Sequence, residues 1–115
     1  MRASSLLAVL LPLVSANYHA QCDCQTWSEG GQWGYNRDLT HWICYHVLTN
    51  TASFMENYGR CVATQSLIDG QTWEDMCVKY GTQEGYRAFD NKGAPIESGP
   101  LLKVGAATGH CPDRY

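Results

Sequence analysis

Six cysteines in a chain of 115 residues constrain the fold more than any other feature of the sequence. An even number of cysteines in a short exported chain predicts disulfides, because an oxidising compartment lets such bridges persist. A zinc site is the alternative, but only Cys22 and Cys24 lie close together, and their spacing suits a single tetrahedral ion poorly. We therefore predict three disulfides among Cys22, Cys24, Cys44, Cys61, Cys77 and Cys111.

The N-terminal residues form a pattern typical of a secretory signal. Arg2 gives a basic start, an apolar run follows at residues 6–14, and small side chains end the pattern. A membrane anchor is the alternative, but a span needs about 20 apolar residues, and this shorter run is broken by Pro12. We expect a signal peptide at 1–16, a single cysteine-rich domain at 17–115, and no membrane span.

The mature domain is too short to bury a large hydrophobic core. Each bridge that closes a loop of about 15 residues or more adds about 2–4 kcal/mol to the free energy of unfolding. The disulfides are therefore expected to supply a large share of the net stability.

The charged residues give little indication of a particular partner, but they argue against polyanionic partners. Removal of the leader takes away Arg2 and leaves seven of the eight basic side chains against eleven acidic ones, a formal charge of −4. The basic side chains are scattered singly, so they form no stripe that neutralises phosphates. We expect no binding of nucleic acid and no attachment to an anionic membrane.

Two helices are predicted. Apolar side chains at i, i+3, i+4 and i+7 form one stripe over 70–80, where Asp69 is the expected N-cap and Gly81 the left-handed stop. A second helix is predicted over 39–49, with Asp38 as its candidate cap.

The remaining segments alternate with a period of two or are bounded by turn residues, which predicts strands. Residues 53–58 also have capping-box spacing between Ser53 and Glu56, but their aromatic alternation favours a strand. The expected strands and hairpin arms cover residues 22–27, 53–58, 61–68, 85–89, 94–96 and 101–104.

This order of elements predicts an α+β fold. Two helices are expected to pack on one face of an antiparallel sheet, as a small disulfide-stapled two-layer sandwich. The expected order is ferredoxin-like: strand, helix, strand, strand, helix, strand, with an inserted hairpin.

The placement of the cysteines also resembles a known family. The resemblance lies in Gln21-Cys22-Asp23-Cys24-Gln25, a helix carrying Cys44, the motif Tyr58-Gly59-Arg60-Cys61, and a helix carrying Cys77. This framework is similar to the α subunit of the smut-fungus killer toxin of the killer-protein-six type, whose fold small secreted effectors of plant-associated fungi are thought to share. The resemblance covers about residues 21–81. The chain has fewer cysteines than the toxin and a longer C-terminal part, 82–110.

The resemblance implies an α/β sandwich that acts by binding, without catalysis or cofactor. It also implies that Cys22 and Cys24 pair with Cys44 and Cys61, which leaves Cys77 to pair with Cys111. Six cysteines permit 15 pairings, and the residues themselves do not choose among them.

The four histidines are expected to be structural. His41 and His46 are five residues apart on a predicted helix and so point away from each other rather than at one metal ion. His19 lies near the N-terminus of the mature chain, and His110 stands beside Cys111.

A small secreted ribonuclease is the alternative class. Such an enzyme needs a carboxylate, an arginine and a histidine at one phosphate, and Glu56, Arg60 and His46 are the candidates. Their convergence in a cleft would favour an enzyme. The acidic charge of the chain opposes a polyanionic substrate, so we expect no enzymatic activity.

Aromatic residues around a glycine pair are the candidate binding site. Trp27, Trp33 and Tyr35 surround Gly30 and Gly31 and fit no amphipathic pattern. Exposed aromatic side chains on such a loop stack on sugars or anchor a protein interface, although they also fold back over the core in small stapled domains. An exposed loop without a polar cleft would favour a binding protein.

The sequence therefore predicts a secreted, monomeric effector or killer-toxin-like protein. Its expected partner is a host or competitor protein or a cell-surface glycan, bound as an extracellular or host target without a cofactor.

Overall fold

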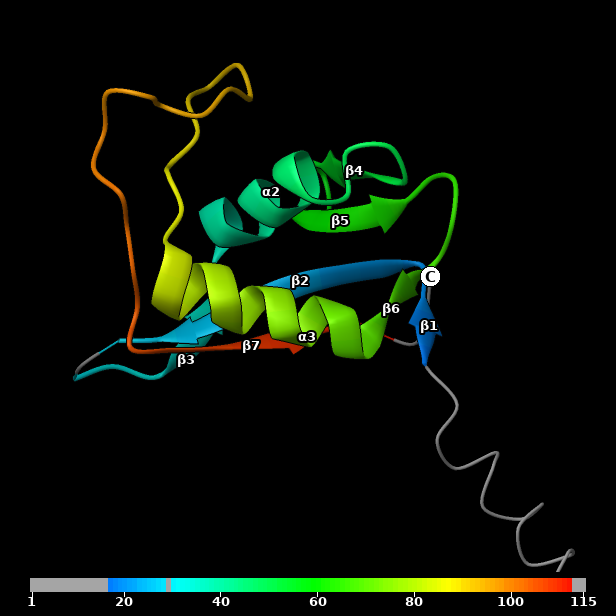
Figure 1. Cartoon of the computed structure of the whole chain (residues 1–115), viewed down its shortest axis with the longest axis horizontal. Coiled ribbons are helices and arrows are strands. Elements are labelled where there is room, and N and C mark those ends of the chain that lie inside the picture. Colours follow the sequence, from blue (N-terminus) through cyan, green and yellow to red (C-terminus); the bar gives the residue numbers. More distant parts are fainter. Residues whose placement is uncertain (1–16, 29, 113–115) are drawn as a thin grey trace, which may run out of the picture.

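The computed structural model describes residues 17–28 and 30–112, so the expected signal peptide lies outside the described residues. The described chain has the predicted α+β architecture, with two helices on an antiparallel sheet (Figure 1). In chain order the elements are β1 (Tyr18–His19), β2 (Gln21–Trp27), β3 (Trp33–Tyr35), α2 (Arg37–His46), β4 (Ala52–Met55), β5 (Arg60–Ala63), β6 (Ile68–Asp69), α3 (Gly70–Val78), the π-helical η2 (Lys79–Glu84) and β7 (Ala106–His110).

The central strand of the sheet is β2. It pairs with β5 at its start, while β3 and β7 flank its second half, and β4 pairs with β5. All these pairings are antiparallel, and β1 forms a separate ladder with β6. The short strands β1, β3 and β6 are additional to the expected ferredoxin-like order, which the structure does not reproduce in its simple form.

Helix α3 begins where the sequence predicts but ends later. The side chain of Asp69 caps it by accepting a hydrogen bond from the backbone N of Thr72 at 3.2 Å. The expected stop at Gly81 is wrong, because α3 continues into η2 and the left-handed residue is Gly85, with φ of 92°. Gly81 is buried instead, and a Cβ there would lie 2.9 Å from a methyl group of Leu39, so close packing requires a small residue.

Helix α2 begins and ends earlier than the predicted helix over 39–49. Its cap is Asn36, whose Oδ1 accepts from the backbone N of Leu39 at 2.9 Å. The expected cap, Asp38, instead accepts a hydrogen bond from the backbone N of Phe89 at 3.2 Å. Asp38 therefore makes a tertiary contact, which no local sequence pattern indicates, and does not cap the helix.

The N-terminal strands follow the predicted alternation. The strand expected at 22–27 is confirmed as β2, and the one favoured at 53–58 is present in its first part as β4. The strand expected at 61–68 is divided by bends into β5 and β6.

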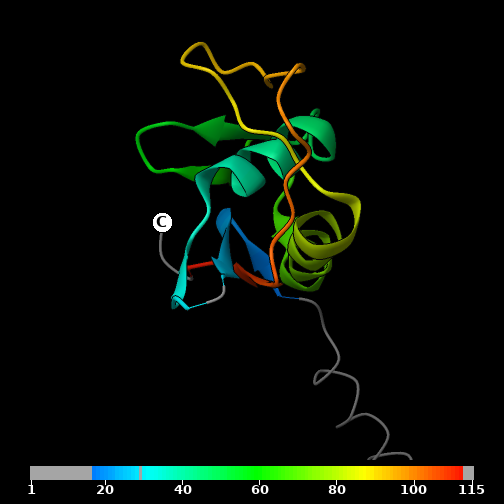
Figure 2. The same ribbon diagram turned by 90° about the vertical axis from the view of Figure 1, so that its left-hand side faces the viewer.

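The predicted hairpin over 85–96 forms in part, as a turn at Asp90–Gly93 without regular strands: the backbone N of Asp90 donates to the oxygen of Ala94, and that of Ile96 donates to the oxygen of Ala88. Its arms and the segment 101–104 form isolated bridges, Phe89 with Pro95 and Tyr86 with Leu102, so the strand expected at 101–104 is absent. The segment between η2 and β7 rises past α2 as a long loop (yellow to orange in Figure 2). Proline interrupts strand pairing, and both Pro95 and Pro100 lie in this segment.

The three expected disulfides are present, but the pairing implied by the family resemblance is wrong. The bridges are Cys22–Cys111, Cys24–Cys77 and Cys44–Cys61. Asp23 lies opposite His110 in the β2–β7 ladder, which brings the neighbouring Cys22 and Cys111 together. The resemblance covers only 21–81 and therefore takes no account of β7.

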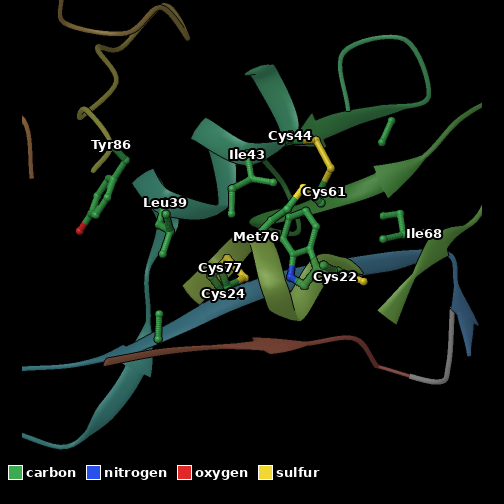
Figure 3. Packing of buried hydrophobic residues seen from close by; sticks show 13 residues of the cluster. Cys22, Cys24, Leu39, Ile43, Cys44, Cys61, Ile68, Met76, Cys77 and Tyr86 are labelled. Atoms are coloured by element: carbon green, nitrogen blue, oxygen red, sulfur yellow. A yellow bond between two sulfur atoms is a disulfide. The ribbon is translucent and has the colours of Figure 1, made fainter. Parts of the chain in front are cut away.

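The bridges lie inside the hydrophobic core (Figure 3). Leu39 and Ile43 of α2 and Trp73 of α3 are fully buried against the cystines. The indole N–H of Trp73 donates to the backbone oxygen of Asp23 at 2.7 Å, which satisfies the one polar atom of that side chain. None of the helices in the described ranges has the length and apolar character that a membrane crossing requires.

Candidate functional site

The alternation of β2 divides its side chains between two surfaces. Cys22 and Cys24 point toward the helices, whereas Gln21, Asp23, Gln25 and Trp27 lie on the opposite surface. We call this opposite surface of the sheet the open face. The neighbouring strands contribute side chains that lie in register with those of β2, namely Trp33, Tyr35, Val62 and His110. Arg60 of β5 joins them through its ion pair with Asp23.

The three aromatic residues predicted from the sequence gather on the open face. Trp27 lies directly opposite Trp33, and Gln25 lies opposite Tyr35. Side chains that face each other across antiparallel strands, and those two residues apart, share one surface. The exposed fractions are 36% for Trp27, 50% for Trp33 and 48% for Tyr35. These side chains do not fold back into the core, and we call them the aromatic row.

Tyr35 is fixed at the end of the aromatic row. Its hydroxyl donates to the backbone oxygen of Gly59, and desolvation by burial of the phenol raises its pKa to about 12. Gly59 has φ of 69°, and a Cβ there would lie 2.7 Å from the Tyr35 hydroxyl. Glycine is therefore required at this position both by its backbone conformation and by the approach of Tyr35.

A buried carboxylate organises the polar part of the open face. Asp23 is only 3% exposed, and its Oδ2 lies 3.0 Å from Nε of Arg60 and 3.1 Å from Nδ1 of His110. Gln21 accepts a further hydrogen bond from Nη1 of Arg60 at 3.2 Å. We call Asp23, Arg60 and His110 the polar cluster. Because an ionised carboxylate only accepts, Nδ1 of His110 is the donor.

Two hollows adjoin the polar cluster. The first has a volume of about 170 Å³ and is lined by Asp23, Gln25, Tyr35, Tyr58, Gly59, Arg60 and His110. The second, of about 520 Å³, is more apolar and is lined by Ala20, Gln21, Tyr58, Arg60 and Val62. Both share Tyr58 and Arg60, so the aromatic row, the polar cluster and the hollows form one continuous surface.

The sequence pattern missed the polar cluster. Asp23 stands between two bridged cysteines, and His110 directly precedes another. A known Cys22–Cys111 bridge would have placed Asp23 and His110 side by side. The missing signal was therefore the disulfide pairing, not the residue types.

The histidine, carboxylate and arginine proposed for an enzyme pair with other residues. Glu56 forms an ion pair with Arg37, and Arg60 binds Asp23. The ring of His46 lies 3.8 Å from that of Trp42, measured between centroids. Within residues 17–28 and 30–112, no group of three or more His, Cys, Asp and Glu side chains is arranged to hold a metal ion.

The chain was compared with protein-family models, curated proteins and solved structures, and none of them matches it.

Proposed function

We propose that this chain is a secreted, monomeric binding protein that engages an extracellular target of a host or competitor through the open face of its sheet. The observation that carries the proposal is the aromatic row, in which Trp27, Trp33 and Tyr35 present half-exposed rings on one surface. Aromatic side chains and arginine dominate the energetics of binding surfaces, and Arg60 lies beside this row. The protein acts as an effector or as a killer-toxin-like protein, without catalysis.

Three disulfides support secretion, because they persist in oxidising compartments. They also hold the open face in place, since Cys22 and Cys24 anchor β2 from its other surface. A rigid surface loses little conformational entropy when a partner binds. The arrangement therefore suits recognition by a preformed surface.

The test is a pull-down from host extracellular fluid with the oxidised mature protein. The variant Trp33→Ala/Tyr35→Ala removes the most exposed part of the aromatic row. Its matched control is Leu67→Ala/Ile96→Ala, which removes exposed apolar side chains outside the open face. Capture by the parent and the control, but not by the first variant, supports the proposal. Equal capture by all three proteins contradicts it.

A secreted hydrolase of the ribonuclease type is the second candidate. The observation that favours it is His110, whose ring is oriented by the buried Asp23 beside Arg60, an arrangement that general acid–base catalysis also uses. Cleavage of RNA by the parent but not by His110→Gln would establish this activity in place of the binding function.

A further inference from the structure

The polar cluster leaves hydrogen-bonding groups of fixed orientation beside the first hollow. Arg60 uses Nε and Nη1 for Asp23 and Gln21, and in the described part of the chain its Nη2 has no partner. His110 binds Asp23 through Nδ1, which leaves Nε2 unused among the described residues. The hydroxyl of Tyr58 is likewise without a partner there, and this side chain is 62% exposed.

The buried carboxylate adds a second, independent sign of a binding site. Oδ1 of Asp23 is buried and has no hydrogen-bond partner in the described ranges, and Asp23 lines the first hollow. An unsatisfied buried acceptor costs free energy, so such atoms mark places where a ligand or water completes the network. A water molecule is a donor of suitable size for this acceptor.

The aromatic row gives the second half of the recognition surface. The faces of sugar rings carry C–H groups. These groups stack on aromatic side chains, because the face of an aromatic ring is electron-rich. Trp27 and Trp33 stand opposite each other, and Tyr35 both continues this row and lines the hollow. A chain of sugar rings on the aromatic row therefore reaches the polar cluster without a break.

The charge near the hollow fits one anionic group rather than a polyanion. Arg60 is the only arginine or lysine that lines either of the two hollows described above. An arginine donates well to a planar carboxylate, whereas a nucleic acid requires a series of basic contacts. The tyrosine and glutamine side chains around Arg60 suit the hydroxyl groups of a sugar.

We propose that the open face binds an oligosaccharide that carries a carboxylate, that is, a chain containing a uronic acid. Its rings stack on Trp33 and Trp27, and its carboxylate accepts hydrogen bonds from Arg60 and Tyr58. Nε2 of His110 binds a sugar hydroxyl. This inference rests on the proposed binding function and names the chemistry of the target.

The experiment is calorimetric titration of the oxidised mature protein with xylotriose that carries a single glucuronic acid residue and with the methyl ester of the same tetrasaccharide, which has the same rings without the charge. We expect the acid to bind about tenfold more tightly, as expected for a hydrogen bond to a charged group. Arg60→Lys is expected to weaken binding of the acid more than binding of the ester, because only the acid offers a carboxylate to the guanidinium. Trp33→Ala is expected to weaken both, and Tyr58→Phe tests the second donor with little risk to the fold.

Lys103→Gln is the matched control, because it removes an exposed cation that lines neither of the two hollows described above. Equal affinity for acid and ester overturns the carboxylate assignment. Binding of neither probe, with capture in the pull-down still dependent on Trp33 and Tyr35, overturns the saccharide and leaves the binding function in place. If neither probe binds and capture in the pull-down does not depend on Trp33 and Tyr35, both proposals are overturned.

Discussion

His110 and Asp23 are 87 residues apart in the sequence and are joined by a contact of 3.1 Å between Nδ1 and Oδ2. The contact follows from the register of the sheet, in which the two residues lie opposite each other on β7 and β2. The Cys22–Cys111 bridge stands next to them. Strand β7 therefore completes a cluster whose other members, Asp23 and Arg60, lie on β2 and β5.

Replacement of the central carboxylate tests this cluster. Asp23→Asn removes the charge that Arg60 and His110 share while nearly preserving the volume of the side chain. We expect the free energy of unfolding to fall by about 1.5–3 kcal/mol, the range of hydrogen bonds to charged groups, in denaturant titrations followed by circular dichroism. Glu97→Gln removes an exposed carboxylate and is expected to change stability by less than about 0.5 kcal/mol. Equal changes in the free energy of unfolding for the two variants would show that the polar cluster contributes nothing to stability.

A local signal predicted the start of α3. Asp69 caps α3 as expected, because its acceptor lies within one turn of the donor at Thr72. The alternation of β2 was predicted from its local pattern, whereas the three disulfides were predicted from the even number of cysteines.

Long-range pairing decided the features that the sequence did not predict. Strand β7 has the sequence Ala-Ala-Thr-Gly-His, which has no strand-forming pattern, and it is a strand because it pairs with β2. A side chain larger than hydrogen at Gly109 would approach Trp73 to 2.7 Å, so this glycine serves packing. The aromatic row was predicted from residue type, whereas the polar cluster depends on this pairing.

The length of chain that each bridge spans predicts how much stability is lost when that bridge is removed. The bridges Cys22–Cys111, Cys24–Cys77 and Cys44–Cys61 span 89, 53 and 17 residues. Loop-closure entropy grows with the span, from about 3 kcal/mol for a 15-residue loop to about 4.7 kcal/mol for 100 residues. Double replacement by alanine is therefore expected to destabilise most at the first pair and least at the third in denaturant titrations. The reverse ranking would contradict this account.

The bridges themselves are checked by peptide mapping of the unreduced protein. We expect peptides that contain Cys24 to be joined to those with Cys77, which excludes the pairing implied by the family resemblance. A peptide joining Cys77 to Cys111 would contradict the structure.

Gly59 is expected to be intolerant of a side chain. Gly59→Ala places a Cβ against the Tyr35 hydroxyl and adds the strain of a positive φ, whereas Gly93→Ala adds only the strain, since no atom lies within 4 Å. We expect a loss of about 1–3 kcal/mol at Gly93 from backbone strain and a larger loss at Gly59. Spectrophotometric titration should also show the pKa of Tyr35 moving down from about 12 in Gly59→Ala. Equal losses in the free energy of unfolding for the two variants would mean that Tyr35 moves aside without cost.

His41 is expected to make the fold sensitive to acid. Its ring is stacked between Phe89 and Phe54, at centroid distances of 3.7 and 4.2 Å, and its Nδ1 is buried without a partner in the described ranges. Desolvation lowers its pKa in the folded protein, as does the nearby Arg37, while Glu56 and Asp38 oppose the shift.

An unfolded histidine takes up a proton below about pH 6.5, whereas folded His41 resists protonation. Its contribution to stability is therefore complete above that pH and is lost as the pH falls through the folded pKa. We expect the free energy of unfolding to decrease from pH 7.5 to pH 5 in the parent and to decrease less in His41→Phe, which keeps the stacked ring but does not titrate. Urea titrations at both pH values measure this difference. An identical pH dependence in the two proteins would show that other groups account for it.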